Sequence, residues 1–181
     1  MRVISGAARG RKLNQPSGHK IRPTSDRVKE SVFTIVQFDI EGRRVLDLFA
    51  GTGQYGIEAL SRGAGSVVFV DTSADSVKLV KENLKLTGLS ENASVYGRDA
   101  LRYLEDSEKF DLIFIDPPYD TKLADKALDK IAEFDKLNIN GIIICELNAD
   151  KPSPQVVFPY ALQKEYKYGG VKVVKYTREE T

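Results

Sequence analysis

The sequence predicts an α/β protein built on a Rossmann-like, doubly wound and mostly parallel sheet of seven strands. Strand-like and helix-like segments alternate between residues 45 and 146, which is typical of parallel strands because each crossover needs a helix to cover the sheet. Two further strand-like segments flank Gly169-Gly170, a pair suited to a tight hairpin turn. The last two strands are therefore expected to be antiparallel.

Hydrophobic periodicity gives the bounds of these segments. Five strands are expected before the terminal hairpin, at residues 45–49, 66–70, 93–96, 110–115 and 141–146. Four helices are expected between them, at 55–62, 74–87, 100–105 and 123–137. The strands of the terminal hairpin are expected at 161–168 and 171–176.

A short extension, residues 1–40, is expected to precede this body of residues 41–181. Residues 2–5 and 11–15 have the pattern of two short strands separated by glycines, which predicts a β-hairpin. Apolar residues from Val28 to Val36 recur at helical spacing. A helix is therefore expected to connect the hairpin to the body.

Charge is distributed unevenly along the chain, although its net value is only +1 at pH 7. Residues 1–30 hold eight basic side chains and two acidic ones, a net charge of +6, so the rest of the chain carries −5. A structured cationic segment on a mildly acidic body favours contact with the phosphates of a nucleic acid. A solvated basic tail is the alternative interpretation.

Length and composition restrict the class of protein. The 181 residues supply one sizeable core, and no apolar run approaches the roughly 18 residues of a membrane span. We therefore expect a soluble, cytoplasmic protein, and a monomer. The single cysteine, Cys145, excludes an internal disulfide and lies in an apolar run, which favours a buried, inert thiol.

Metal chemistry is not expected, because no cluster of His, Cys and carboxylate residues has the spacing of metal ligands. The sole histidine, His19, lies in a polar loop beside Lys20. A solvated or phosphate-adjacent role for this side chain is favoured over catalysis.

A glycine-rich turn follows the first strand of the body. Residues 47–56 read Asp-Leu-Phe-Ala-Gly-Thr-Gly-Gln-Tyr-Gly. Glycines permit close approach of the backbone to a ligand, and the N-terminus of the next helix suits an anionic group. Ligands of doubly wound sheets bind outside the carboxyl ends of the strands, so a small molecule is expected here. The glycine spacing also matches a dinucleotide fingerprint, with Asp71 as the ribose acid, and does not choose a cofactor.

Acidic residues at successive strand ends favour S-adenosylmethionine as the cofactor. Asp47 suits a cationic ligand better than a pyrophosphate, and the sulfonium and amino groups of S-adenosylmethionine are cations. Asp71 is expected to hold the ribose and Asp99 the adenine amino group, although each residue alone is equally well explained as a helix cap. The predicted cofactor-binding residues are Asp47, Phe49, Ala50, Gly51, Gly53, Asp71, Thr72, Asp99 and Ala100.

The tetrapeptide Asp116-Pro117-Pro118-Tyr119 follows the fourth strand and predicts a site for an amine-bearing base. Asp116 and the Pro117 carbonyl can accept the two hydrogen atoms of an exocyclic amine, which holds its nitrogen against a methyl donor. Consecutive prolines restrain the backbone. Tyr119 offers a flat face for a base extruded from its stack. The alternative is a Pro-Pro turn with a cap-like aspartate.

Along its whole length the chain resembles the bacterial small-subunit ribosomal RNA guanine-N2 methyltransferases, a family of class I methyltransferases. The segments that carry the resemblance are residues 2–6, 9–13, 22–30, 47–53, 56–64 and 116–119. The N-terminal segments are much more specific than the tetrapeptide, which recurs among many amino-group methyltransferases. This resemblance implies methyl transfer from S-adenosylmethionine to one guanine of 16S rRNA, within a small ribosomal subunit or an assembly intermediate.

The same resemblance implies residue roles. Residues 116–119 would hold the guanine, and residues 47–53 with Asp71 and Asp99 the cofactor. The basic segments would bind RNA through Arg9, Arg11, Lys12, Arg22, Thr24 and Arg27. The sequence departs from the family at Gln54-Tyr55, which is bulkier than the small or aliphatic residues expected, and at Asp71, where glutamate is frequent. Both departures concern contacts with the cofactor rather than the reaction.

Other functions share parts of this pattern. Adenine N6 in a nucleic acid or a glutamine side chain in a protein are alternative acceptors, although those enzymes more often carry Asn in place of Asp116. A nicotinamide-dependent dehydrogenase can use the same glycine turn. An RNA-binding assembly factor with a vestigial pocket is a further alternative, and it would bind RNA without turnover of any acceptor.

Overall fold

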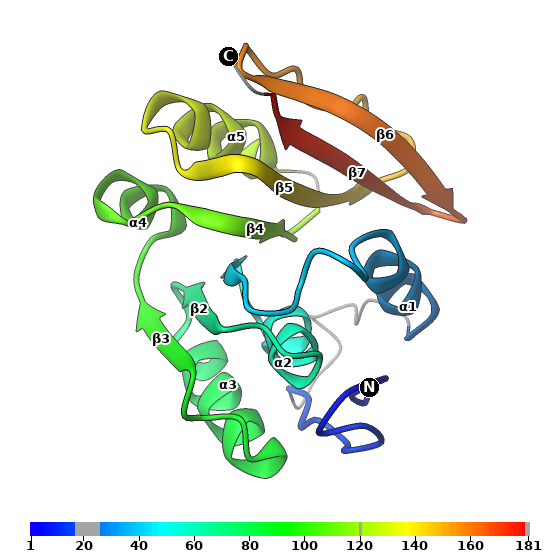
Figure 1. Cartoon of the computed structure of the whole chain (residues 1–181), viewed down its shortest axis with the longest axis vertical. Helices are drawn as coiled ribbons and strands as arrows, with labels where there is room; N and C mark the ends of the chain where they lie inside the picture. Colours follow the sequence, from blue (N-terminus) through cyan, green and yellow to red (C-terminus); the bar gives the residue numbers. More distant parts are fainter. Residues whose placement is uncertain (17–25, 120, 180–181) are drawn as a thin grey trace.

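The computed structural model describes residues 1–16, 26–119 and 121–179, and in this part of the chain seven strands form one sheet (Figure 1). The strands are β1 (Arg44–Leu48), β2 (Ser66–Asp71), β3 (Ala93–Gly97), β4 (Phe110–Ile115), β5 (Leu137–Asn148), β6 (Tyr160–Tyr168) and β7 (Val171–Arg178). The helices are α1 (Asp26–Ile35), α2 (Gln54–Ser61), α3 (Ala74–Thr87), α4 (Ala100–Asp106) and α5 (Leu123–Glu133). None of the helices in the described residues is long and apolar enough to span a membrane.

The strand order β3-β2-β1-β4-β5-β7-β6 confirms the predicted doubly wound sheet with an antiparallel terminal hairpin. The chain winds outward from β1 to β3 and then returns to place β4 against β1, and strands β1 to β5 are parallel. β7 pairs antiparallel with both β5 and β6. The chain reverses its winding between β1 and β4, where ligands of such sheets bind.

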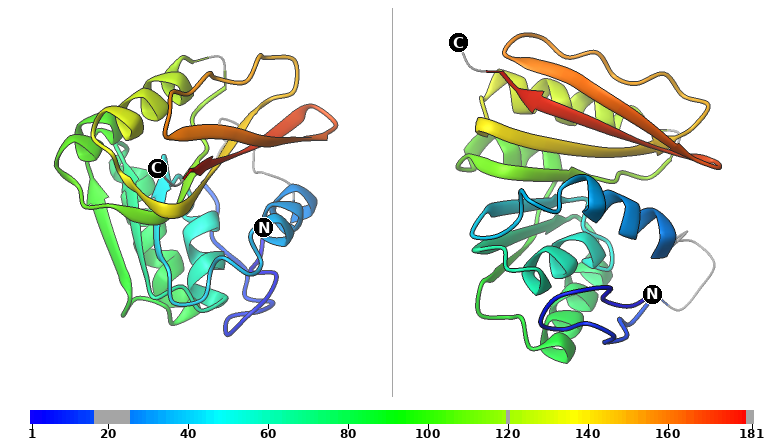
Figure 2. Two further views of the ribbon diagram at one scale, coloured as in Figure 1. Left: turned by 45° about the horizontal axis from the view of Figure 1, so that its top comes forward. Right: turned by 45° about the vertical axis from the view of Figure 1, so that its right-hand side comes forward.

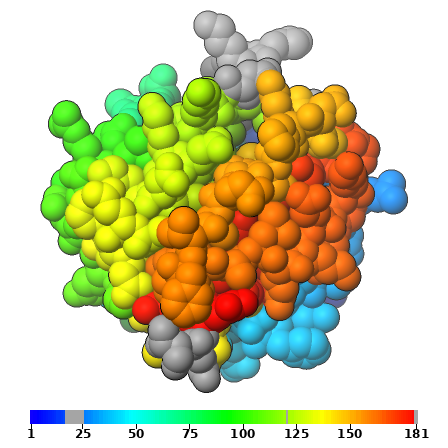
Figure 3. Space-filling model, turned by 90° about the horizontal axis from the view of Figure 1, so that it is seen from above, coloured from blue at the N-terminus to red at the C-terminus, as the bar shows by residue number. Residues whose placement is uncertain are grey.

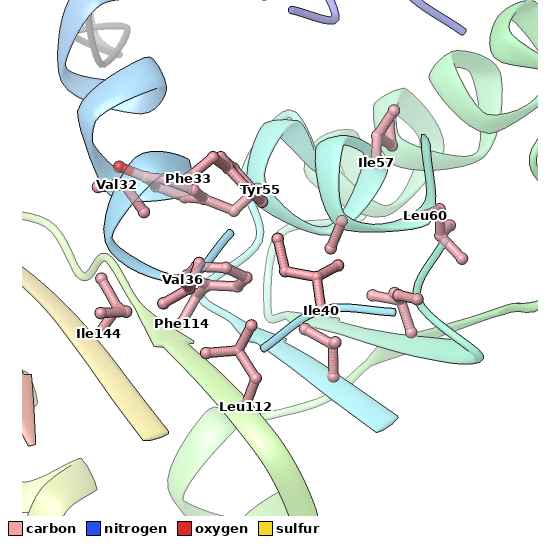
Figure 4. Packing of buried hydrophobic residues seen from close by; sticks show 14 of the residues in the cluster. Val32, Phe33, Val36, Ile40, Tyr55, Ile57, Leu60, Leu112, Phe114 and Ile144 are labelled. Atoms are coloured by element: carbon pink, nitrogen blue, oxygen red, sulfur yellow. The ribbon is translucent and has the colours of Figure 1, made fainter. Parts of the chain in front are cut away.

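Alternate residues of the central strands serve two separate hydrophobic layers. Val45 of β1 packs in the layer of α1, α2 and α3, whereas its neighbour Leu46 packs in the layer of α4 and α5. This alternation follows from the period of two along a strand, and both faces of a parallel sheet need covering. Figure 2 shows the helices on either side of the sheet. The interior of the first layer includes Phe33 and Phe114 (Figure 4).

The helix predicted at 123–137 was too long at its C-terminus. α5 ends at Glu133, and Asp135 takes a left-handed φ of 48° that no helix can continue. The Lys136 N–H then donates to the Ile131 carbonyl at 2.9 Å, which closes the helix end. Leu137 pairs with Phe110 and begins β5, so this strand is also longer than the predicted 141–146.

The predicted N-terminal hairpin is present in short form, with an antiparallel bridge between Arg2 and Lys12 and backbone hydrogen bonds from Val3 N–H to the Arg11 carbonyl and from Leu13 N–H to the Met1 carbonyl. The first strand also contacts α2, because the N–H groups of Ile4 and Ser5 donate to the carboxylate of Glu58. Gly6, at φ 80°, lies so close to Ser61 that a Cβ atom would overlap its carbonyl oxygen. The hairpin is therefore hydrogen-bonded both within itself and to α2.

Candidate active site

The predicted site residues meet at one edge of the sheet because they follow parallel strands in register. Leu48 at the end of β1 is level with Val70 of β2 and with Ile115 of β4, and Asp71 is level with Gly97 of β3. The glycine turn, Asp71, Asp99 and the tetrapeptide all leave the sheet at this edge. The structure thus brings together segments that are up to about 70 residues apart in the chain.

The glycine turn has the backbone of a ligand cradle. Phe49, Gly51 and Gly53 have φ values of 65°, 55° and 76°, all in the left-handed region. Such a conformation is costly for Phe49 and marks a functional turn when the surroundings impose it. Gly53 is the N-cap of α2 and supplies no side chain to cap it. The positive end of α2 therefore suits a ligand carboxylate such as that of a methionine moiety.

Asp47 of β1 supports the glycine turn through a hydrogen bond to the backbone of α2. Its side chain is 1% exposed, and Oδ2 accepts a hydrogen bond from the Gly56 N–H at 2.9 Å. Burial raises the pKa of this carboxyl to about 8. The observed contact joins β1 to α2, and the predicted contact of Asp47 with a cationic ligand stays a prediction.

Asp71 connects the glycine turn with the end of β2. Its Oδ2 accepts from the Gly51 N–H and its Oδ1 from the Ser73 N–H, both at 2.8 Å. A carboxylate with one hydrogen bond on each oxygen retains lone pairs for further donors, such as ribose hydroxyls. The geometry therefore fits the predicted role beside Thr72, which is exposed.

Asp99 caps α4. Its Oδ1 accepts from the Arg102 N–H at 2.9 Å, which is the capping role considered as an alternative to adenine binding. The next residue, Ala100, is buried in the layer of α4 and α5. The carboxylate of Asp99 remains exposed at the strand edge, so the predicted contact with an adenine amino group stays a prediction.

The last residue of the tetrapeptide, Tyr119, has its hydroxyl group fixed by a hydrogen bond to Glu146. Tyr119 Oη donates to Glu146 Oε1 at 2.8 Å, and Glu146 is 3% exposed at the end of β5. Sequence reasoning did not single out Glu146. One signal was available, because a carboxylate directly after the apolar run 142–145 stands beside the tetrapeptide once β4 and β5 are parallel.

A pocket of about 360 Å³ opens on the β5 side of the tetrapeptide. Its walls come from residues 117–119 of the tetrapeptide, from the end of β5, from the start of α5 and from Lys151, Pro152 and Pro154. This volume lies in the range of small-molecule sites. Figure 3 shows one face of the molecule, on which β6, in orange, lies beside α5, in yellow-green.

The basic residues predicted to bind RNA lie on the surface wherever they are described. Arg9, Arg11, Lys12 and Arg27 are exposed. None of these four forms an ion pair with another residue in the described ranges. Arg22 and Thr24, and also His19, lie outside the described residues.

Two buried contacts that sequence reasoning missed fasten the N-terminal segment near the glycine turn. Lys29 and Glu58 lie 3.5 Å apart with no exposed surface, and Lys29 Nζ also donates to the Arg2 carbonyl. Burial lowers the pKa of Lys29, against the raising effect of the Glu58 charge. Both residues fall within segments that carried the resemblance, but no local pattern indicated that they would pair.

Asn83 of α3 provides the second contact. Its Oδ1 accepts from the Asn14 N–H at 2.7 Å, and its Nδ2 donates to the carbonyls of Asn14 and Thr52 at 3.1 and 3.0 Å. Thr52 lies within the glycine turn. One buried amide therefore links the N-terminal segment to the predicted cofactor cradle.

The cysteine and the acidic side chains bear on two other kinds of chemistry, thiol nucleophilicity and metal binding. Cys145 is fully buried, as predicted, and burial raises the pKa of its thiol, which disfavours a nucleophilic thiolate. Among the described residues no group of three or more His, Cys, Asp or Glu side chains is placed to hold a metal ion.

Known proteins show the same fold and related sequences. The family model described as "Conserved hypothetical protein 95" matches residues 1–177. The chain is 41% identical to the Bacillus subtilis protein YlbH, named provisionally as an rRNA methyltransferase, over 97% of this chain and 98% of that protein. It is 38% identical to Ribosomal RNA small subunit methyltransferase D of Haemophilus influenzae, over 84% and 81%.

Among solved structures, the Escherichia coli protein yhhF, named provisionally as a methyltransferase, superposes with a TM-score of 0.90 at 29% identity. The superposition covers 100% of this chain and 99% of that one, so it includes the N-terminal segment as well as the sheet. The chain therefore belongs to the family of ribosomal RNA small subunit methyltransferase D, as its motifs predicted.

Proposed function

We propose that this protein transfers the methyl group of S-adenosylmethionine to the exocyclic N2 amine of one guanine in 16S rRNA. The observation that carries the proposal is the meeting of the glycine turn, Asp71 and Asp116-Pro117-Pro118-Tyr119 at one sheet edge. Membership of a family whose named relatives act on small-subunit rRNA supports the acceptor class. Family membership also favours methyl transfer over a nicotinamide-dependent dehydrogenase and over an RNA-binding factor without catalysis.

The cofactor would lie across the ends of β1, β2 and β3. When bound, S-adenosylmethionine supplies a methyl group already activated by its sulfonium. The N-terminus of α2 suits its carboxylate, because Gly53 leaves that helix end without a side-chain cap. Asp71, oriented by the Gly51 and Ser73 N–H groups, would accept the ribose hydroxyls. Asp99 would face the adenine.

The acceptor amine would be held by the tetrapeptide. Asp116 and the Pro117 carbonyl accept its two hydrogen atoms, which directs the nitrogen lone pair at the methyl donor. Asp116, or water beyond it, takes the proton as positive charge develops on the nitrogen. The Tyr119 ring stacks on the base, which must leave its RNA stack to reach this edge.

RNA would approach along the N-terminal segment. Arg9, Arg11, Lys12 and Arg27 present exposed cations to phosphates, and Arg22 and Thr24 belong to the same basic stretch. An unmodified small subunit or an assembly intermediate is the proposed substrate, with a monomeric enzyme in the cytoplasm.

Methyl-labelled S-adenosylmethionine tests the proposal. The protein is incubated with free 16S rRNA and with small subunits that lack the modification, and the labelled nucleotide is mapped by nuclease digestion and mass spectrometry. We expect label at N2 of a single guanine. Label at adenine N6, label in protein, or no transfer to either substrate would each contradict the proposal.

The variant Asp116→Ala adds a test of mechanism, because it removes one acceptor for the amine. Methyl transfer should be abolished while cofactor affinity stays close to that of the wild type. Asp129→Ala on α5 is the matched control, since Asp129 is exposed and away from the tetrapeptide. Full activity of the Asp116→Ala variant would refute the proposed role.

A further inference from the structure

One carboxylate at the end of β5 joins the two halves of the site. Glu146 accepts from Tyr55 Oη at 2.6 Å through Oε2 and from Tyr119 Oη at 2.8 Å through Oε1. Tyr55 is the second residue of α2, two residues after Gly53 of the glycine turn, whereas Tyr119 is the last residue of the tetrapeptide. The cofactor side and the acceptor side thus share a buried hydrogen-bond acceptor.

Tyr55 gives this connection a fixed anchor. Figure 4 shows its ring with Phe33 of α1 and Phe114 of β4. The ring centroid lies 5.1 Å from that of Phe114 with an angle of 15° between the planes, and 6.2 Å from that of Phe33. Tyr55 is 3% exposed. Its hydroxyl therefore has one position, set by a close-packed core.

Tyr119 is restrained at both ends as a result. Pro117 and Pro118 restrict the backbone that leads into it, and the bond to Glu146 holds the far end of its ring. A hydrogen bond from a hydroxyl to a carboxylate is stronger and more directional than one between neutral groups. The plane of the proposed stacking face is thereby defined before any base arrives.

We propose that Glu146 and Tyr55 are positioning residues for the acceptor, which act by fixing the ring of Tyr119 against an extruded purine base. This inference rests on the function proposed above and assigns a role to Tyr55, which belongs to the Gln54-Tyr55 pair that is bulkier than expected from the resemblance. A preoriented face reduces the entropy lost when the base is held for transfer.

A purely structural role makes a different prediction. In that case, removal of these hydroxyl groups would lower thermal stability and leave turnover at permissive temperature unchanged. Tyr160 supplies the matched control. It is 4% exposed in the same sheet, and its hydroxyl lies 3.2 Å from two acceptors, the Ile131 carbonyl and Asp135 Oδ1. The variant Tyr160→Phe removes a buried hydroxyl without touching Glu146.

The first test compares kinetics of Glu146→Gln, Tyr55→Phe and Tyr119→Phe. Each variant should lower kcat/KM for the RNA substrate by roughly tenfold or more, because a charge-assisted hydrogen bond is removed. Cofactor affinity should stay within about twofold, since none of the three changes alters a proposed cofactor ligand. The double variant Glu146→Gln/Tyr119→Phe should have nearly the same kcat/KM as Glu146→Gln alone, because both changes remove the same hydrogen bond. Tyr160→Phe should retain wild-type kcat/KM.

The second test needs no turnover. Protein labelled with fluorotyrosine is observed by ¹⁹F NMR, and the Tyr119 resonance is assigned by its disappearance in Tyr119→Phe. The Tyr55→Phe variant should shift the Tyr119 resonance, whereas Tyr160→Phe should not. Because Tyr55→Phe keeps the packed ring, it also serves if Glu146→Gln does not fold.

The outcomes separate the two proposals. An active wild type whose three variants are unimpaired, or impaired only as much as Tyr160→Phe, overturns the positioning roles. An unmoved Tyr119 resonance in Tyr55→Phe overturns the link through Glu146. A wild type that transfers methyl to neither RNA substrate overturns the proposed function instead, and the NMR result then still decides whether the link exists.

Discussion

Lys29 and Glu58 form an ion pair in which the nitrogen and oxygen lie 3.5 Å apart and neither side chain has exposed surface. Glu58 also accepts from Arg62 Nε at 2.9 Å and from two backbone N–H groups of the N-terminal segment. Such a carboxylate is costly to bury unless all its partners remain. The attachment of the N-terminal segment therefore depends on this cluster.

Replacing Lys29 by Met should lower the free energy of unfolding by about 3 kcal/mol, the lower end for breaking a buried pair, because Glu58 keeps Arg62. Urea denaturation measures the change. Lys78→Met is the control, because the Lys78 side chain is 78% exposed, and it should stay within about 0.5 kcal/mol of wild type. Adding Glu58→Gln to Lys29→Met should cost less than the sum of the single changes. Strict additivity would show that the two side chains are uncoupled.

Asn83→Ala should weaken binding of S-adenosylmethionine by roughly three- to tenfold, because Thr52 in the glycine turn loses a buried hydrogen bond. Isothermal titration calorimetry measures the affinity. Asn14→Ala is the matched control, since Asn14 contacts Asn83 through its backbone groups and its side chain is exposed. Equal affinities for Asn83→Ala and wild type would mean that the turn holds its shape without this amide.

The buried carboxyl of Asp47 should make stability fall with rising pH. Its folded pKa of about 8 lies above its ordinary value of 3.8, so the folded state binds more protons between these values. The contribution is fully present below about pH 4 and is lost as pH rises toward 8, by at most about 1.4 kcal/mol per pH unit. Asp47→Asn should lack this slope, and Asp129→Asn should keep it. Parallel stability curves for wild type and Asp47→Asn would contradict the assignment.

Neutralising the N-terminal cations should weaken RNA binding and reduce its salt dependence. In the triple variant Arg9→Gln, Arg11→Gln, Lys12→Gln, the slope of log affinity against log salt should fall by roughly 0.7 to 0.9 for each phosphate that is no longer neutralised. Filter binding at several salt concentrations measures this. Gln substitutions at the exposed α3 residues Lys78, Lys81 and Lys85 remove the same charge. Equal slopes for the two triple variants would show that only net charge matters.

The sequence was sufficient for the sheet because buried parallel strands are continuous apolar runs and the helices between them carry local end signals. α3 has the predicted bounds, since Ser73 caps its start and Gly88, at φ 73°, ends it. α5 lacks such a glycine. The helix ends where Asp135 takes a left-handed conformation, and a non-glycine residue gives no sequence signal for such a conformation.

The site was predictable where it depended on strand ends and not where it depended on distant partners. Asp71 and the glycine turn follow from chain order and the parallel sheet. The role of Glu146 depends on Tyr55, 91 residues away, and on Tyr119, 27 residues away. The attachment of the N-terminal hairpin to α2 was missed for the same reason, because Glu58 accepts from backbone N–H groups more than 50 residues before it.

The anchoring of the first 14 residues by Glu58, Lys29 and Asn83 has a geometric consequence. The backbone of this segment is hydrogen-bonded to α2 and α3, so the fold sets the separation between that backbone and Asp116. RNA phosphates seated on Arg9 and Arg11 would offer the tetrapeptide only nucleotides at that one separation. The segment would then act as a ruler, choosing the guanine by its distance from a docking point as well as by its chemistry.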